Sequence, residues 1–165
     1  MLNIRHTSKF LSFSIMRVVL QRVSEASVDI GGVQKSCIHQ GLLVFVGIEE
    51  EDGRDDVHWL ASKIVSLRIF SDENGKMNLS VKEVDGEILV ISQFTLFAAS
   101  KKGNRPSFIR AARPEKAIPL YEQFVGVLSE MLGKEVGTGS FGADMQVRLL
   151  NDGPVTLMLD TKNRE

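Results

Sequence analysis

The sequence predicts a single compact α/β domain that contains more strand than helix. Short runs that are continuously apolar, or that alternate apolar and polar residues, recur along the chain and are typical of strands. Two stretches show the longer periodicity of an amphipathic helix. No repeat, low-complexity segment or linker divides the 165 residues, a length at which one domain can bury a core.

The first half of the domain is expected to supply three strands and one helix. Arg17–Ile30 is rich in β-branched residues, and Gly31 and Gly32 favour a hairpin turn into Val33–Ile38. Residues 42–46 are continuously apolar, as in a strand buried on both faces. A helix should follow the acidic loop after them, because four apolar residues share one helical face: Val57, Leu60, Ile64 and Leu67.

The middle of the chain is expected to contain a strand, a basic segment and a second helix. A polar turn at residues 72–76 precedes an apolar strand at residues 88–91. The second helix should run from about Ile118 or Pro119 to Leu132, with Pro119 in the first turn, where proline is tolerated. Its buried face should consist of Leu120, Phe124, Val127, Leu128 and Met131.

The glycines of residues 137–142 spell GxGxxG, a pattern known from dinucleotide-binding loops. That motif requires a helix directly after it, because the pyrophosphate rests on the helix N-terminus. Here residues 145–149 alternate with period two, as do residues 155–159, so two half-buried strands are expected instead. The sequence therefore predicts no dinucleotide site, and the glycines should let a loop pass close to a ligand or another backbone.

The cations are concentrated in residues 101–116. This segment carries six basic residues against one acid, Glu115, although the whole chain has a formal charge of −1. A local basic patch on an otherwise acidic protein favours contact with one phosphate-bearing ligand, and a solvated charge run is the alternative. The basic residues are Lys101, Lys102, Arg105, Arg110, Arg113 and Lys116.

Several classes of site find no support in the sequence. No apolar run approaches the ~20 residues that span a bilayer, so no membrane association is expected. Cys37 is the single cysteine, which excludes an internal disulfide and a multi-cysteine metal site. Cys37, His39 and His58 lack metal-ligand spacing, so we expect no metal and no cofactor. A reducing compartment, the cytoplasm, fits this cysteine usage.

Two polar segments next to apolar strands are the strongest candidates for a site. Residues 92–95 follow the strand at 88–91 directly, where a sheet can fix side chains and amides rigidly; solvated hydroxyls on an edge strand are the alternative. Residues 151–156 contain Gly153-Pro154, which forms either a simple turn or a cis peptide whose carbonyls make a rigid ridge without side chains. No Ser/His/Asp or Cys/His arrangement is evident, so a hydrolase of this kind would need an activated bond.

The segments SQFTL at residues 92–96 and NDGPVT at residues 151–156 together resemble the two signatures of the D-aminoacyl-tRNA deacylase family. The likeness covers Met16 to about Asp160, in order and with family-like spacing. Residues 1–15 contain no acid and fall outside it; we expect a disordered or peripheral extension before a native start at Met16. Three other segments match: MRVVLQRV at 16–23, GNRPSF at 103–108 and FGADM at 141–145.

The resemblance implies a domain over residues 16–165 with a mostly antiparallel, barrel-like sheet and two main helices. It implies a cytoplasmic homodimer that hydrolyses the ester between a D-amino acid, or glycine, and the 3′-terminal adenosine of tRNA. The site would form at the dimer interface, with a cis Gly153-Pro154 ridge inserted from the partner. Its other implied parts are the catalytic Ser92, Gln93, Phe94 and Thr95, an adenosine pocket with Phe141 and Met145, a supporting Arg22, and tRNA phosphate contacts from Lys101, Lys102 and Arg105.

The chemistry suits these residue types, because an aminoacyl ester is already activated and needs mainly positioning and oxyanion stabilisation. Amides near Gln93 and Phe94 would stabilise the oxyanion, and either Thr95 or the RNA 2′-hydroxyl would activate water. Thr95 should orient rather than attack, since no base is visible beside it. Two alternatives stay open: a non-enzymatic nucleic-acid-binding module, supported mainly by the basic segment, and a hydrolase of a different small ester.

Overall fold

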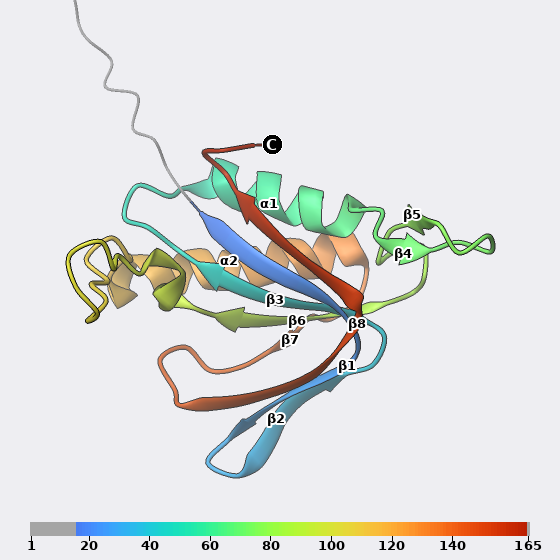
Figure 1. The fold of residues 1–165 in the computed structure, drawn as a ribbon, viewed down its shortest axis with the longest axis horizontal. Coiled ribbons are helices and arrows are strands. Elements are labelled where there is room, and N and C mark those ends of the chain that lie inside the picture. Colours follow the sequence, from blue (N-terminus) through green and yellow to red (C-terminus); the bar gives the residue numbers. More distant parts are fainter. Residues whose placement is uncertain (1–15, 165) are drawn as a thin grey trace, which may run out of the picture.

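The computed structural model describes residues 16–164, so the expectation for residues 1–15 lies outside the described residues (Figure 1). The chain forms a curved sheet with two helices packed against it. Its elements are, in order, β1 (Arg17–Ile30), β2 (Val33–Ile38), β3 (Gly41–Gly47), α1 (Arg54–Ser66), β4 (Phe70–Ser71), β5 (Met77–Leu79), β6 (Glu87–Ser92), the short 3-10 helix η1 (Phe94–Phe97), α2 (Pro114–Leu132), β7 (Gly137–Thr138) and β8 (Met145–Asp160).

The sheet is mixed and nearly closes into a barrel, which confirms the expected α/β fold class. Its order is β2-β1-β3-β6-β7, and β8 also pairs with β1. The three pairings made by β1 are antiparallel, whereas β3–β6 and β6–β7 are parallel. The connection through α1 returns β6 in the direction of β3, as parallel pairing requires. Ser36 of β2 closes the barrel, because its hydroxyl donates to the Thr138 carbonyl of β7 at 2.7 Å.

Strands β3 and β6 are buried on both faces, as the continuous apolar run predicted. Leu42, Val44 and Val46 belong to the core cluster that the sheet shares with α1 and α2. Leu43 belongs to a second cluster, inside the curl formed by β1, β2 and β8. Strand β6 alternates in the same way, since Val90 joins the first cluster and Leu89 the second. The end of β6 therefore lies between two packed layers, and its position is fixed from both sides.

Helix α2 begins at Pro114, four to five residues before the predicted start at Ile118 or Pro119, so that prediction was wrong. Pro114 occupies the first turn, where a missing N–H costs nothing. Pro119 lies inside the helix, and the packing of Ala117 and Leu120 against the sheet outweighs the lost hydrogen bond. Within the described residues, no helix is long and apolar enough to cross a membrane.

Replacing Gly126, an exposed residue of α2, with alanine should stabilise the protein. A Cβ built there has nothing within 4 Å, so only the helix propensity changes, by about 0.8–1 kcal/mol in favour of alanine. A thermal melt should show a Tm higher by roughly 2–4 °C. The control is Gly133→Ala at the end of the same helix, which should destabilise because Gly133 has φ +83°. A lower Tm for Gly126→Ala would contradict this account.

Strand β8 continues through Gly153-Pro154, so the two strands expected in this region are one element. Its pairing with β1 is irregular there: Gln21 faces Thr156, and Val23 faces Asn151. The single residue Arg22 therefore lies opposite the four residues 152–155. This bulge bends β8 at the end of the molecule that carries the β4–β5 hairpin (Figure 1).

Candidate active site

A cavity of about 250 Å³ opens at the carboxyl end of β6. It is lined by Ser92, Gln93 and Phe94 from one segment and by Phe141 and Met145 from the chain before and at the start of β8. The structure thus brings together five of the predicted site residues, from two segments that are far apart in the sequence. Thr95 is absent from the cavity wall, but its Oγ accepts a hydrogen bond from Nε2 of Gln93. Small and apolar residues complete the wall: Val46, Ile48, Ile91, Ala112, Ala117, Gly142, Ala143 and Val147.

The backbone amides at the end of β6 are not equivalent. The Gln93 N–H donates to the Val46 carbonyl at 2.7 Å, so this amide already has a partner in the sheet. The Phe94 N–H comes first in η1, and the first amides of a helix have no partner within it. The amide of Phe94 is therefore available to an anionic oxygen, and that of Gln93 is not.

Among residues 16–164, Thr95 has no partner that could activate it as a nucleophile. Its side chain accepts a hydrogen bond from the amide of Gln93, a neutral donor. Among the described residues, no group of three or more His, Cys, Asp or Glu side chains could hold a metal ion. This arrangement leaves the hydroxyl proton of Thr95 free to point toward a water molecule or a substrate.

Arg17 holds η1 in position, a role that the sequence did not reveal. Its Nη1 donates to the Leu96 carbonyl at 3.0 Å, and its guanidinium also pairs with Asp160 at 3.0 Å. The buried Phe97 ring has the guanidinium of Arg17 at 5.2 Å and that of Arg110 at 5.6 Å from its centroid. Because η1 is fixed in this way, the amide of Phe94 has a defined direction.

Tyr121 of α2 supports the part of the cavity wall that Phe141 forms. The Tyr121 hydroxyl donates to the Val90 carbonyl at 2.9 Å, and its ring meets that of Phe141 edge-on at 6.1 Å. Met145 fills the space that a side chain at Gly139 would need, since a Cβ there would lie 2.3 Å from its sulfur. At Gly139 the loop of residues 137–142 therefore passes close to the side chain of Met145, and not to another backbone.

A Tyr121→Phe variant tests the link between α2 and β6. It should lose about 1 kcal/mol at neutral pH, because the Val90 carbonyl loses its donor. Burial raises the pKa of Tyr121 to about 12 from 10.0, so wild-type stability is fully present below pH 10 and declines as pH rises toward 12. Urea unfolding at pH 8 and pH 11 should show the difference between variant and wild type shrinking at pH 11. Tyr121 is the single tyrosine, so a constant difference would contradict this assignment.

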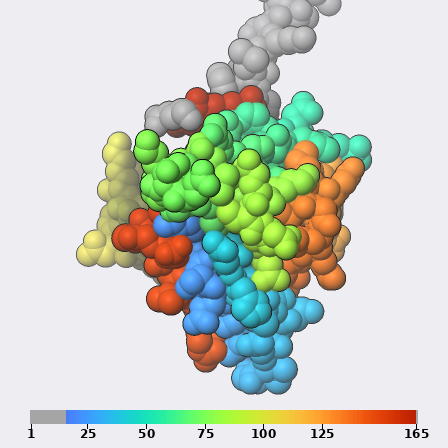
Figure 2. Space-filling view, turned by 90° about the vertical axis from the view of Figure 1, so that its right-hand side faces the viewer, coloured from blue at the N-terminus to red at the C-terminus, as the bar shows by residue number. Residues whose placement is uncertain are grey.

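Arg22 fixes the Gly153-Pro154 segment in place. Its Nε donates to the Asp152 carbonyl at 3.0 Å, and its Nη1 donates to the Ile69 carbonyl at 2.6 Å. Its side chain is 10% exposed, whereas Gly153 and Pro154 are exposed on the surface. The Gly153–Pro154 peptide bond is cis. Figure 2 shows this end of the molecule, where β8 in red reaches the surface beside the β4–β5 hairpin in green.

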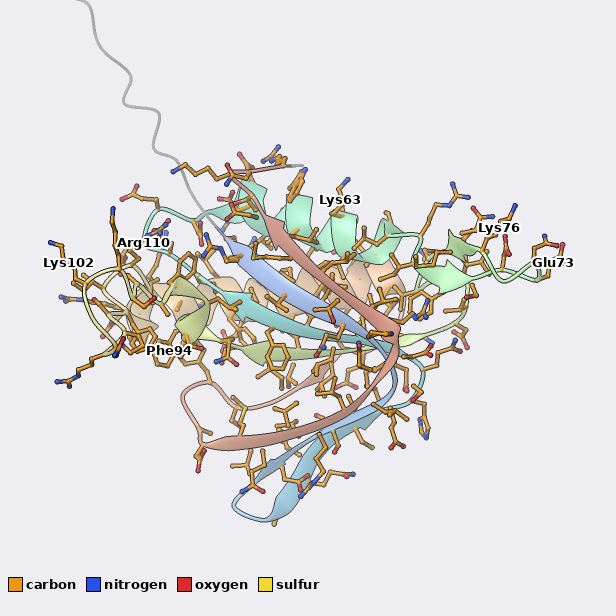
Figure 3. The ribbon with its side chains drawn as sticks, in the orientation of Figure 1. Lys63, Glu73, Lys76, Phe94, Lys102 and Arg110 are labelled. Atoms are coloured by element: carbon orange, nitrogen blue, oxygen red, sulfur yellow. The ribbon has the colours of Figure 1, made fainter. Side chains whose placement is uncertain are left out.

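The two signature segments lie at opposite ends of the sheet in one chain. Arg22, which faces the bulge of β8, pairs with Leu42, whereas Ser92 pairs with Val46. Four residues of β3 separate these levels, roughly 13 Å at the rise of a strand, and Phe94 continues away from the bulge. Figure 3 shows Phe94 at one end and Glu73 of the β4–β5 hairpin at the other. Gly153-Pro154 therefore does not join the cavity of its own chain.

The basic segment lies at the cavity end of the molecule, where Lys102 and Arg110 project (Figure 3). Within the described part of the chain, the exposed Lys101, Lys102 and Arg105 make no ion pair. Arg110 pairs with Glu49 at 2.9 Å and so belongs to the framework of the loop. The three unpaired cations leave positive charge beside the cavity.

Comparison with known protein families identifies the family of this chain. The family model described as D-Tyr-tRNA(Tyr) deacylase matches residues 19–160. The chain belongs to this deacylase family. As a deacylase, it is a hydrolase that acts on ester bonds. The match includes both signature segments and the residues of the cavity wall.

Relatives of this deacylase from several bacteria match over 150 residues, which is 91% of this chain and 100% of each relative. They are proteins named D-aminoacyl-tRNA deacylase, from Bacteroides thetaiotaomicron (65% identical), Bacteroides fragilis (67%) and Akkermansia muciniphila (61%).

Two solved structures share the fold of the deacylase. The first, titled c-Myc DNA Unwinding Element Binding Protein, has a TM-score of 0.82 and 43% identity, and covers 87% of this chain and 97% of that one. The second is titled as the structural analysis of a probable eukaryotic D-amino acid tRNA deacylase. It has a TM-score of 0.76 and covers 88% of this chain and 99% of that one, and its 19% identity supports the shared fold alone.

Proposed function

We propose that the protein hydrolyses the ester between a D-amino acid, or glycine, and the 3′-terminal adenosine of tRNA, and that it rejects L-aminoacyl esters. The observation that carries this proposal is the cavity that joins the Ser92–Phe94 segment with Phe141 and Met145. The apolar wall of this cavity suits a nucleoside. Its polar side lies where a 3′ ester would meet the amide of Phe94. We place this activity in the cytoplasm, where charged tRNA is used.

The proposed chemistry needs little from the side chains. The Phe94 N–H would stabilise the oxyanion that develops on the ester carbonyl, and the Thr95 hydroxyl, held by Gln93, would orient the attacking water. The vicinal 2′-hydroxyl of the RNA is the alternative activator of that water. Trapping an acyl group on Thr95 would contradict the orienting role.

The proposed active unit is a homodimer. One chain presents the cavity at one end and the Arg22-supported Gly153-Pro154 segment at the other, so a second copy is needed to bring the two together. Exposed apolar side chains on β8, Leu150 and Met158, are available to such an interface. Sedimentation of the pure protein should show a dimer, and a monomer that retains full activity would contradict the shared site.

A side-chain-free ridge would explain how one site accepts many D residues. Backbone atoms of Gly153 and Pro154 placed where an L side chain must lie would exclude it, without selecting among D residues. Glycine has nothing to exclude and should be hydrolysed as well. The test compares D-Tyr-tRNA, L-Tyr-tRNA, Gly-tRNA and a free ester of D-tyrosine. Rapid cleavage of L-Tyr-tRNA would overturn the filter, and preference for the free ester would point to a different small-ester hydrolase.

A second candidate function, in addition to ester hydrolysis, is DNA binding, which the similar solved structure titled c-Myc DNA Unwinding Element Binding Protein favours. The basic segment is the feature of this chain that favours it. Filter binding with DNA, measured beside the ester assay, separates the two functions, because a DNA-binding role requires retention of DNA that carries no ester.

A double charge reversal, Lys101→Glu with Lys102→Glu, should weaken tRNA binding about tenfold or more at low salt. The two ammonium groups are exposed and unpaired among the described residues, so they would contact phosphates without reading sequence. Filter binding across a salt series should show the difference fading as salt rises. The matched control, Lys35→Glu with Lys63→Glu, changes the charge equally on other surfaces. Equal losses for both pairs, or none for the first, would contradict a local phosphate contact.

A further inference from the structure

Apolar side chains are exposed where the basic loop meets the cavity. Phe94 lines the cavity and is 56% exposed, and the ring of Phe108 meets it edge-on at 5.1 Å. The next residue, Ile109, is 91% exposed. We call these three side chains the apolar rim. Phe94 and Phe108 are in contact beside the cavity, and Ile109, the next residue, extends the apolar surface onto the loop.

The rim is held in place rather than left on a loose loop. Ala99 and Ser107 exchange two backbone hydrogen bonds of 2.8 and 2.9 Å, which close the loop at its base. On the other side, the Ala111 N–H donates to the Phe108 carbonyl, and the Ala112 N–H donates to the Ile48 carbonyl. The position of Ile109 between these anchors is thus fixed, although its side chain contacts mainly solvent.

Positive charge lies in the same loop as the rim. Lys101, Lys102 and Arg105 are exposed on the segment that Ala99 and Ser107 close. Apolar surface next to unpaired cations matches the chemistry of single-stranded nucleic acid, in which flat bases alternate with phosphates. A contact of this loop with itself across a two-fold axis does not match, because its cations would then face one another.

We propose that the apolar rim binds the nucleotides immediately 5′ of the terminal adenosine, with a base packed over Phe108 and Ile109 and its phosphates beside Lys101 and Lys102. This inference rests on the proposed function, which places the terminal adenosine in the cavity. The single-stranded 3′ end would then leave the cavity past Phe94 and lie along the rim. The contact reads the face of a base and therefore tolerates any base.

The experiment compares three D-tyrosyl esters that share the reacting atoms: D-tyrosyl-adenosine, D-tyrosyl-CCA trinucleotide and D-Tyr-tRNA. Ile109→Ala, alone and with Phe108→Ala, is compared with Val33→Ala, which truncates another exposed side chain, on β2. For the trinucleotide and the tRNA, kcat/KM should fall roughly five- to tenfold in the rim variants, as expected for one lost base contact. For D-tyrosyl-adenosine, kcat/KM of Ile109→Ala should stay within about twofold. Val33→Ala should match wild type on all three.

The outcomes are separable. If wild type cleaves no D-tyrosyl ester, the proposed function fails. If wild type cleaves all three but Ile109→Ala loses as much with D-tyrosyl-adenosine as with the trinucleotide, or loses nothing with either, the rim is not a nucleotide site. A change in the oligomeric state of Ile109→Ala without RNA, measured by light scattering, would assign the rim to a protein interface and would also overturn the inference.

Discussion

Gly41→Ala is expected to destabilise the protein by about 3 kcal/mol or more. A Cβ at Gly41 would lie 1.9 Å from the Glu87 carbonyl oxygen and 2.8 Å from the Glu87 nitrogen. Both atoms belong to the backbone of β6, which pairs with β3 at this residue, so no side-chain rotation can relieve the clash. The start of the parallel pairing would have to separate.

Urea unfolding followed by the fluorescence of Trp59, the single tryptophan, measures this loss. Gly126→Ala is the matched control, since it adds the same methyl group in open space and should change stability in the opposite direction. Because β6 also carries the cavity residues at its other end, Gly41→Ala should reduce deacylation wherever it reduces the folded fraction. A variant as stable as wild type would show that the two strands separate more easily than their packing indicates.

The strands were predictable because their signals are local. The β-branched residues of Arg17–Ile30, the glycines at its end and the apolar run of β3 each fix an element within a few neighbours. The start of α2 was not predictable in this way. Pro119 is a strong signal for a first turn, but tertiary packing tolerates it inside the helix. The continuity of β8 through Gly153-Pro154 likewise depends on pairing with β1, far away in the sequence.

The site could be predicted where it has unusual residues and not where it has ordinary ones. The segment Ser92 to Phe94 attracts notice because polar residues follow a buried strand, and the structure does place it on a cavity with Phe141 and Met145. Arg17 and Tyr121 carry no such local mark. Their effect on the site comes from single hydrogen bonds to the carbonyls of Leu96 and Val90, which only the folded chain defines.

Arg22→Met should reduce deacylation of D-Tyr-tRNA at least tenfold and narrow the preference for D over L esters. Methionine keeps most of the apolar stem of Arg22 but removes the donors to the Asp152 and Ile69 carbonyls. Each lost charged hydrogen bond costs about 1.5–3 kcal/mol, and the Gly153-Pro154 segment loses its support from β1. Arg22→Lys should recover part of the activity, since an ammonium group can reach one carbonyl but cannot match a guanidinium fork.

Arg148→Met is the control for a lost charge on the same two strands. Arg148 pairs with Asp29 across β8 and β1, and the Asp29 side chain is only 14% exposed, so removal of Arg148 should cost about 1–3 kcal/mol but leave deacylation unchanged. Steady-state kcat/KM for D- and L-Tyr-tRNA, measured below the melting temperature of each variant, separates a displaced ridge from an unfolded protein. Wild-type activity in a folded Arg22→Met variant would contradict the supporting role.

Mixing variants locates the site that Arg22 supports. In a heterodimer of Arg22→Met and Thr95→Ala subunits, one of the two shared sites combines an intact Thr95 segment with an intact Gly153-Pro154 ridge. Equal amounts exchanged to equilibrium should therefore recover about a quarter of wild-type activity, because half of the dimers are mixed and each has one intact site. If both residues served the same chain, no mixture would exceed its parents. Recovery would thus show that Arg22 supports the cavity of the partner subunit. The cavity of its own chain lies at the other end of the sheet.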